Sequence, residues 1–128
     1  MTEEPQRDAQ IHSRRDQGCL VVEVLTVRVT EGPVIDSIQQ QLNNLLDEDA
    51  GQRVVVDLSR VEIMSSAMLS VLVQTYRHLA ESSGRLVLCG LKPPVAKVFE
   101  ITRLDQLFRL EDDVAAALAR LAITGSEN

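Results

Sequence analysis

Aromatic residues are scarce in this chain of 128 residues, which contains only Tyr76, Phe99 and Phe108. Three aromatic side chains are too few to build a base-stacking platform for nucleic acid. Positive charge is also in deficit, because 13 lysines and arginines face 19 aspartates and glutamates and leave a net charge of -6. Since basic residues dominate affinity for phosphate backbones, the sequence predicts that neither DNA nor RNA is a direct partner.

Long apolar runs are missing as well. No stretch approaches the roughly 20 apolar residues that are needed to cross a bilayer. The opening residues MTEEPQRD are charged and contain proline, whereas a secretory signal is first basic and then apolar. We therefore expect a cytoplasmic protein without a membrane segment.

Groups that carry metal or enzyme chemistry are few. Cys19 and Cys89 are far apart and lie in apolar stretches, which favours reduced, buried thiols over a disulfide or metal ligands. His12 and His78 add too few ligands for a zinc site. The sequence has neither a glycine-rich phosphate loop nor the G-x-S-x-G motif of a hydrolase. We expect no metal, no cofactor and no enzymatic activity.

The composition that is present is globular, with 45% hydrophobic and 25% charged residues. A chain of this length fits one domain, and no repeat or linker divides it. Polar residues at both ends predict a flexible N-terminus at 1–10 and a flexible tail at 123–128. A single domain is therefore predicted at 11–122.

Apolar periodicity predicts alternating strands and helices in the first part of the chain. Residues 11–15 and 19–29 predict a hairpin, and both faces of its second strand carry apolar side chains. Partial cover on both sides of that strand would explain this pattern. A helix is predicted at 37–49, where Asp36 and Gln39 form a capping box.

The rest of the chain continues the alternation and implies a mixed, largely parallel sheet, because the middle connections are long enough for right-handed crossovers. The predicted elements are a strand at 53–58, a helix from Ser65 to Ser83 that ends at a left-handed Gly84, a strand at 85–91, a short helix that starts at Pro93 and Pro94, a strand at 108–110, and a final helix capped by Asp112 or Asp113.

Two adjacent hydroxyls at the start of the longest helix stand out from ordinary packing patterns. Ser65 and Ser66 follow a strand and a loop, so at least one hydroxyl must face solvent near the free N–H groups of the first turn. One interpretation is a serine N-cap, which contributes about 1 kcal/mol. The other is phosphorylation, which would add about -1.5 to -2 charges and oppose any acidic or apolar surface docked there. The spacing alone favours the cap.

Several motifs in the segment 53–114 fall in the register of one family. They are the strand end D-L-S, the apolar pair Ile63 and Met64 before the serines, the turn at Gly84, the segment C-G-L-K-P-P and the run V-F-E-I-T-x-L-D-x-L-F. On these residues the chain resembles the STAS domain, which bacterial anti-sigma factor antagonists share with the tails of sulfate transporters. The resemblance implies an α/β fold with a mixed, mostly parallel sheet of four or five strands and helices packed mainly on one side.

The resemblance also implies a function and a site. Such antagonists have no enzymatic activity and bind an anti-sigma factor, often a serine kinase of the histidine-kinase-like ATPase type. Phosphorylation of a serine at the helix start ends that binding, and the family pattern places this phosphoacceptor at Ser66. The implied partner-binding residues are Ser65, Ser66 and Met68 on the helix, together with Glu31 and Asp36 of the segment 30–36.

Two residues depart from the family pattern, and they keep alternatives open. Ser65 replaces an aspartate, and Met68 replaces a glycine and would crowd a partner docked at the helix start. A phosphorylation-independent scaffold in a larger regulatory complex is therefore a second hypothesis. Binding of a small ligand or nucleotide in a groove beside the helix is a third.

Overall fold

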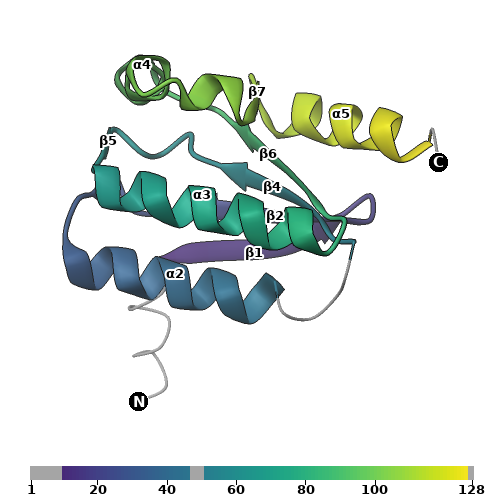
Figure 1. The fold of residues 1–128 in the computed structure, drawn as a ribbon, viewed down its shortest axis with the longest axis horizontal. Coiled ribbons are helices and arrows are strands. Elements are labelled where there is room, and N and C mark those ends of the chain that lie inside the picture. Colours follow the sequence, from purple (N-terminus) through teal and green to yellow (C-terminus); the bar gives the residue numbers. More distant parts are fainter. Residues whose placement is uncertain (1–9, 47–50, 127–128) are drawn as a thin grey trace.

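The computed structural model describes the backbone of residues 10–46 and 51–126 and the side chains of these ranges up to residue 122. Its centre is a five-stranded sheet in the order β1-β2-β4-β6-β7 (Figure 1). Strands β1 and β2 are antiparallel, and β2, β4, β6 and β7 are parallel. The strands are β1 (Ile11–Asp16), β2 (Cys19–Val24), β4 (Arg53–Asp57), β6 (Arg85–Cys89) and β7 (Arg109–Glu111).

Helices cover both faces of the sheet unequally. Apolar side chains of α2, α3 and α4 join the larger core cluster on one face, and α5 packs on the other face through a smaller cluster (Figure 1). The prediction of a mixed, mostly parallel sheet with helices mainly on one side is confirmed. The helices are α2 (Gly32–Leu46), α3 (Ser66–Glu81), α4 (Pro93–Ile101) and α5 (Val114–Ser126), with a short 3-10 helix η1 (Leu104–Gln106) after α4.

The sequence of β2 is apolar on both faces because each face of this strand packs into one of the two core clusters. Val22 and Val24 contribute to the larger cluster under α2 and α3, whereas Val21 faces α5 with Cys19. Since full burial of such a side chain contributes roughly 1.5–3 kcal/mol, both faces stabilise the strand. The expected cover on both sides is confirmed.

The predicted strand at 19–29 is wrong in its second half, because the chain leaves the main sheet after Val24. Neither neighbouring strand extends beyond this level of the sheet. The first residue of β1 is level with Val24, and the last residue of β4, Asp57, is level with Glu23. The chain then forms β3 (Arg28–Val29), which pairs in parallel with β5 (Ile63–Met64) in a separate two-stranded sheet.

Helix α2 begins earlier than predicted, at Gly32, so the proposed capping box of Asp36 and Gln39 lies inside the helix and is wrong. Pro33 fits the first turn because its missing N–H would have no intrahelical acceptor there. The N–H of Ile35 already donates to the carbonyl oxygen of Glu31 at 3.0 Å. The predicted residues 47–49 of this helix lie outside the described part of the chain.

The predicted domain boundaries, at residues 11 and 122, can be compared with the structure only in part. The backbone of α5 is helical to Ser126 and so extends into the predicted tail at 123–128. The predicted flexible N-terminus at 1–10 lies outside the described residues except for Gln10, whose carbonyl oxygen accepts the Leu25 N–H at 2.9 Å.

Gly84 is required for space and not for a left-handed backbone. Ser83 takes the left-handed conformation, with φ 64°, so the predicted role of Gly84 is wrong. A Cβ atom on Gly84 would lie 2.7 Å from the carbonyl oxygen of Gln52 and 2.9 Å from Cδ2 of Leu79. The glycine therefore permits the end of α3 to pass close to the chain that enters β4.

We predict that Gly84→Ala lowers the free energy of unfolding by about 1–3 kcal/mol, because the new methyl group meets backbone that cannot rotate away. Gly32→Ala is the matched control, since nothing lies within 4 Å of its Cβ position. Urea unfolding monitored by circular dichroism measures both. Equal midpoints for the two variants would contradict this account.

Candidate functional site

The start of α3 lies at the end of the sheet where the parallel strands finish, as Figure 1 shows for β5 and the first turn of α3. The chain leaves β4 at Asp57, forms β5 and enters the helix at Ser65. The Ser65 N–H donates to the carbonyl oxygen of Val29 at 3.0 Å, which ties the helix start to β3. Open α/β sheets present their binding sites at this carboxyl end.

The two serines differ in orientation. Ser66, the first residue of α3, is exposed. Ser65 occupies the N-cap position, but its hydroxyl is buried, makes no cap hydrogen bond and has no partner within the described structure. The prediction that at least one hydroxyl faces solvent is confirmed for Ser66, and the prediction of a serine side-chain cap is wrong.

Met68 does not face the surface. Its side chain is 0% exposed and belongs to the core cluster beneath α3. As the third residue of the helix, it lies on the same buried side as Leu69, Val71 and Leu72. The expectation that Met68 lines the surface and crowds a docked partner is therefore wrong, because the helix turns this side chain toward the sheet.

Two apolar side chains that sequence reasoning missed lie beside the helix start. Val27 is 44% exposed and Ile63 is 42% exposed. They are neighbours, because the Val27 carbonyl oxygen accepts the N–H groups of Glu62 at 2.8 Å and Ile63 at 3.3 Å. We call Val27, Ile63 and Ser66 the helix-start surface. The only sequence signal for the pair was apolar character at positions that could equally belong to a strand.

The predicted acidic residues occupy this region without contacting the serine. Glu31 precedes α2, Asp36 lies in its second turn, and both side chains are exposed. Among the described residues, no hydrogen bond or ion pair joins either carboxylate to Ser66. Glu62 instead pairs with Lys92, the residue before α4, at 3.6 Å.

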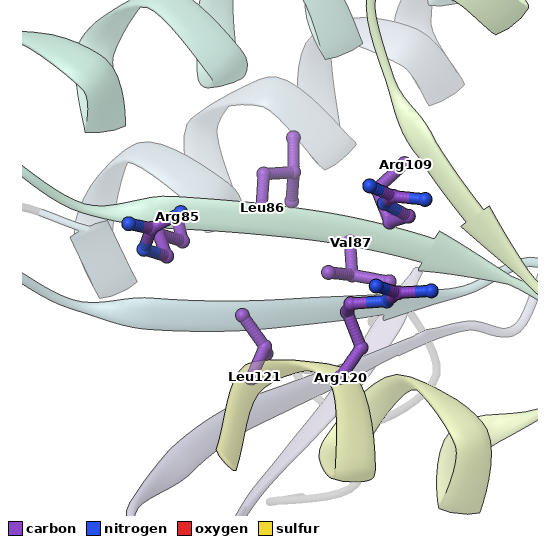
Figure 2. A pocket seen from close by; sticks show the side chains of 6 residues that line it. All are labelled: Arg85, Leu86, Val87, Arg109, Arg120 and Leu121. Atoms are coloured by element: carbon purple, nitrogen blue, oxygen red, sulfur yellow. The ribbon is translucent and has the colours of Figure 1, made fainter. Parts of the chain in front are cut away.

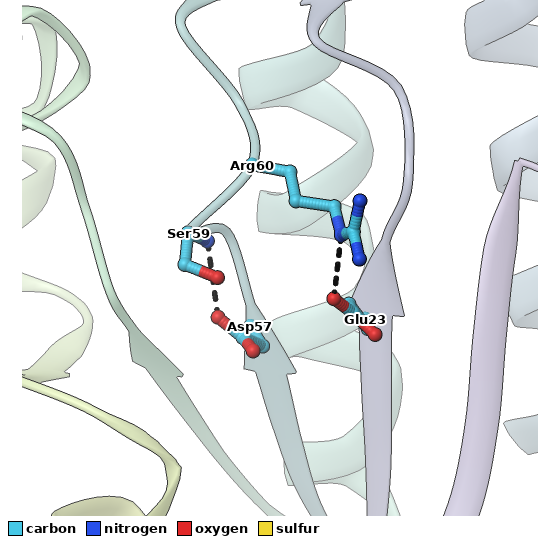
Figure 3. Close-up of polar contacts among 4 residues, drawn as sticks. All are labelled: Glu23, Asp57, Ser59 and Arg60. Atoms are coloured by element: carbon cyan, nitrogen blue, oxygen red, sulfur yellow. Dashed lines mark hydrogen bonds and ion pairs between the residues drawn. The ribbon is translucent and has the colours of Figure 1, made fainter.

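A polar cluster fixes the loop between β4 and β5 (Figure 3). The Arg60 guanidinium donates to the Glu23 carboxylate at 2.8 Å, and the Ser59 N–H donates to the Asp57 carboxylate at 3.0 Å. The hydrogen bond to Glu23 raises the pKa of Arg60. A Cβ on Gly90 would lie 2.9 Å from Asp57 Oδ1, so this loop passes close to the end of β6. The cluster positions the chain that leads to Ser66.

Within residues 10–46 and 51–126, no group of three or more histidine, cysteine, aspartate or glutamate side chains is placed to hold a metal ion. None of the helices described is both long enough and apolar enough to span a membrane.

The prediction of buried, reduced thiols is confirmed for Cys19 and Cys89. Cys19 precedes Leu20, which is level with Val54, whereas Cys89 is level with Asp57. The two cysteines are thus four residues apart along the strand direction, or about 13 Å, too far for a disulfide.

Comparison with known proteins identifies the family. The family model of the STAS domain matches residues 32–117. BtrV of Bordetella bronchiseptica, which carries the name of an anti-sigma factor antagonist, is 36% identical over 106 residues that cover 74% of this chain and 91% of BtrV. An anti-sigma F factor antagonist of Paenibacillus polymyxa is 22% identical over 88 residues, which cover 69% of this chain and 75% of that protein.

A solved structure shows the same fold. The STAS domain protein from Planctomyces limnophilus, described as an anti-sigma-factor antagonist, superposes with a TM-score of 0.77 at 20% identity and covers 87% of this chain and 97% of its own. The open, mostly parallel five-stranded sheet is that of an α/β module with this fold. The chain belongs to the STAS domain family, and the resemblance seen in the sequence is confirmed.

We predict that the two helix caps contribute unequally to stability. Asp113 Oδ1 accepts the Ala116 N–H at 2.8 Å, so Asp113→Ala should lower the free energy of unfolding by about 1 kcal/mol. Ser65→Ala should be neutral or stabilising, because the buried Ser65 hydroxyl has no partner to lose. Urea unfolding of both variants measures the difference. A loss at Ser65 as large as that at Asp113 would show that the hydroxyl caps α3 in solution.

We predict a decline in stability with rising pH that depends on Cys89. Burial, followed by the nearby carboxylates of Asp57 and Asp113, raises the pKa of its thiol from 9.0 to about 12. The thiol ionises more readily when the chain is unfolded, so its contribution is complete below pH 9.0 and is lost as the pH approaches 12. The expected slope is about 1.4 kcal/mol per pH unit.

Cys89→Ala should remove more of this slope than Cys19→Ala, because burial also raises the pKa of the Cys19 thiol but by less. The measurement is the free energy of unfolding in urea from pH 8 to about 11, compared with the wild-type chain at each pH. Parallel curves for the Cys89 variant and the wild type would contradict the assignment to Cys89.

Proposed function

We propose that this chain is a non-catalytic, cytoplasmic bacterial signalling module that binds an anti-sigma factor or a related serine kinase of the histidine-kinase-like ATPase type. The helix-start surface would form the centre of the interface, with Glu31 and Asp36 at its margin. Ser66 would accept the phosphate that ends binding. The identity with BtrV and the exposure of Ser66 support this proposal.

The exposure of Ser66 is the observation that carries the proposal. Ser65 and Met68 both turn their side chains inward, so the hydroxyl of Ser66 is the serine group at the helix start that a kinase can reach. The two departures from the family pattern therefore leave the surface open. Neither places a bulky or charged side chain over the phosphate acceptor.

Electrostatics explains how a phosphate could act as a switch. The first turn of α3 has unsatisfied N–H groups and no acidic side chain, so the helix dipole would stabilise the phosphate on the free module. Docking would then bury about -1.5 to -2 charges against a partner that covers the apolar Val27 and Ile63. The cost falls on the complex and not on the free domain, so phosphorylation would favour release.

The test compares Ser66→Asp and Ser66→Ala for binding to the cognate anti-sigma factor by calorimetry. We expect Ser66→Asp to weaken binding by about 5- to 150-fold and Ser66→Ala to leave it nearly unchanged. Ser13→Asp is a matched control that adds the same charge at an exposed position on β1. Mass spectrometry after incubation with the kinase and ATP should find phosphate on Ser66.

The second candidate function is a phosphorylation-independent scaffold. The exposed apolar pair Val27 and Ile63 favours it, because these side chains could hold a partner whatever the state of Ser66. Equal affinity of the two Ser66 variants, or phosphate on other residues only, would replace the switch with this scaffold. If the two Ser66 variants bind with equal affinity and Ile63→Asp abolishes binding, the scaffold would use the same helix-start surface.

A further inference from the structure

Strand register brings arginines together at the end of the sheet opposite Ser66. Arg53 and Arg85 start β4 and β6 and are partners in register. Arg109 starts β7 and is level with Val87, two residues beyond Arg85. Because directly paired residues of parallel strands share a face, and Val87 packs toward α5, all three arginines belong to the face that α5 covers.

Helix α5 adds a further arginine and closes a pocket. The pocket has a volume of about 140 Å³ and is lined by Arg85, Leu86, Val87, Arg109, Arg120 and Leu121. Figure 2 shows Arg109 and Arg120 on one side of it and Arg85 on the other, with the apolar Val87 and Leu121 between them. All three arginines are exposed to solvent, and their guanidinium groups are therefore accessible to an anion from outside.

The cations of this pocket are poorly balanced within the described structure. Arg120 is tied to the Glu111 carboxylate at 3.2 Å. Arg85 and Arg109 have no ion pair with any described residue, although the chain as a whole carries a net charge of -6. Arg53 directly opposite Arg85 is a like-charge pair, which destabilises a sheet. An anion held between Arg85 and Arg109 would balance the charge of these two pocket residues.

We propose that the pocket of Arg85, Arg109 and Arg120, which we call the arginine pocket, binds a phosphate-type oxyanion, either the free ion or the phosphoryl end of a small metabolite. The planar fork of an arginine matches phosphate oxygens in pairs, and groups on opposite walls suit a tetrahedral dianion. A volume of about 140 Å³ is sufficient for one such group. The site is independent of the proposed switch at Ser66.

The experiment follows amide resonances of the full chain by NMR during titration with sodium phosphate, against sodium chloride of equal ionic strength. We expect saturable shifts centred on Val87, Arg109 and Leu121. Arg85→Gln with Arg109→Gln should weaken phosphate binding by at least about tenfold, since two charge-assisted contacts are lost. Arg14→Gln with Arg77→Gln removes the same charge from β1 and α3 and should change the affinity less than about twofold.

Further titrations identify the source and the chemistry. If glycerol 3-phosphate binds more tightly than phosphate, the ligand of the arginine pocket is the phosphoryl end of a metabolite. If it binds equally or more weakly, the ligand is the free ion. Arg85→Lys with Arg109→Lys, which keeps charge without the fork, should bind phosphate at an intermediate strength. Acetate that saturates the same resonances as strongly as phosphate would overturn the proposal. The proposal would also be overturned if the variant with Arg85→Gln and Arg109→Gln bound phosphate as tightly as the wild type. The arginines would then only cover the apolar side chains beneath them.

Discussion

The rest of the structure depends on burial of β4 between two parallel neighbours. Val54, Val55 and Val56 are all 0% exposed, and hydrogen bonds to β2 and β6 satisfy both edges of the strand. A strand that is fixed on both faces and both edges has one possible register, because a shift of one residue would turn its side chains to the wrong faces. The direction and height at which the chain leaves β4 are therefore set by the core.

This constraint reaches the functional surface through a short, tied segment. The Leu58 N–H donates to the Cys89 carbonyl oxygen at 2.9 Å, and Ser65 is bound to Val29. The helix start is thus held at two points in the sheet region, and α3 has little freedom to rotate about its axis. That fixed rotation turns Ser65 and Met68 inward and leaves Ser66 outside, so a partner meets a rigid surface and not a mobile loop.

Residue patterns predicted those parts of the fold that depend on local chemistry or on long apolar runs. The strand at β4, the proline start of α4 and the cap at Asp113 are of this kind. Strand β5 was not predicted, and the residues of β3 were predicted only as the end of the strand at 19–29 and not as a partner of β5. The core brings these two short segments side by side, and their own residues do not determine this pairing. The sequence placed serines at the start of α3, but which hydroxyl faces solvent depends on how the helix is rotated on the sheet.

The arginines were invisible to sequence reasoning for a related reason. Arg53, Arg85 and Arg109 are far apart in the chain, and each looks like an ordinary charged residue at the start of a strand. Only the register of three parallel strands brings them to one face. A residue pattern can predict that a sheet is parallel, but it does not contain the alignment of one strand against the next.

The smaller of the two apolar clusters is the one that holds α5, and it is separate from the larger core on the opposite face of the sheet. Helix α5 is held to the sheet by Val114, Ala117, Leu118 and Leu121, whereas the opposite face carries three helices. Since local opening costs less where fewer apolar contacts are lost, we expect α5 to open locally while the larger cluster on the opposite face stays packed. Each such opening would move Arg120 away from Arg85 and Arg109 and would expose Cys89 to solvent. The arginine pocket would therefore be complete only while α5 is packed on the sheet.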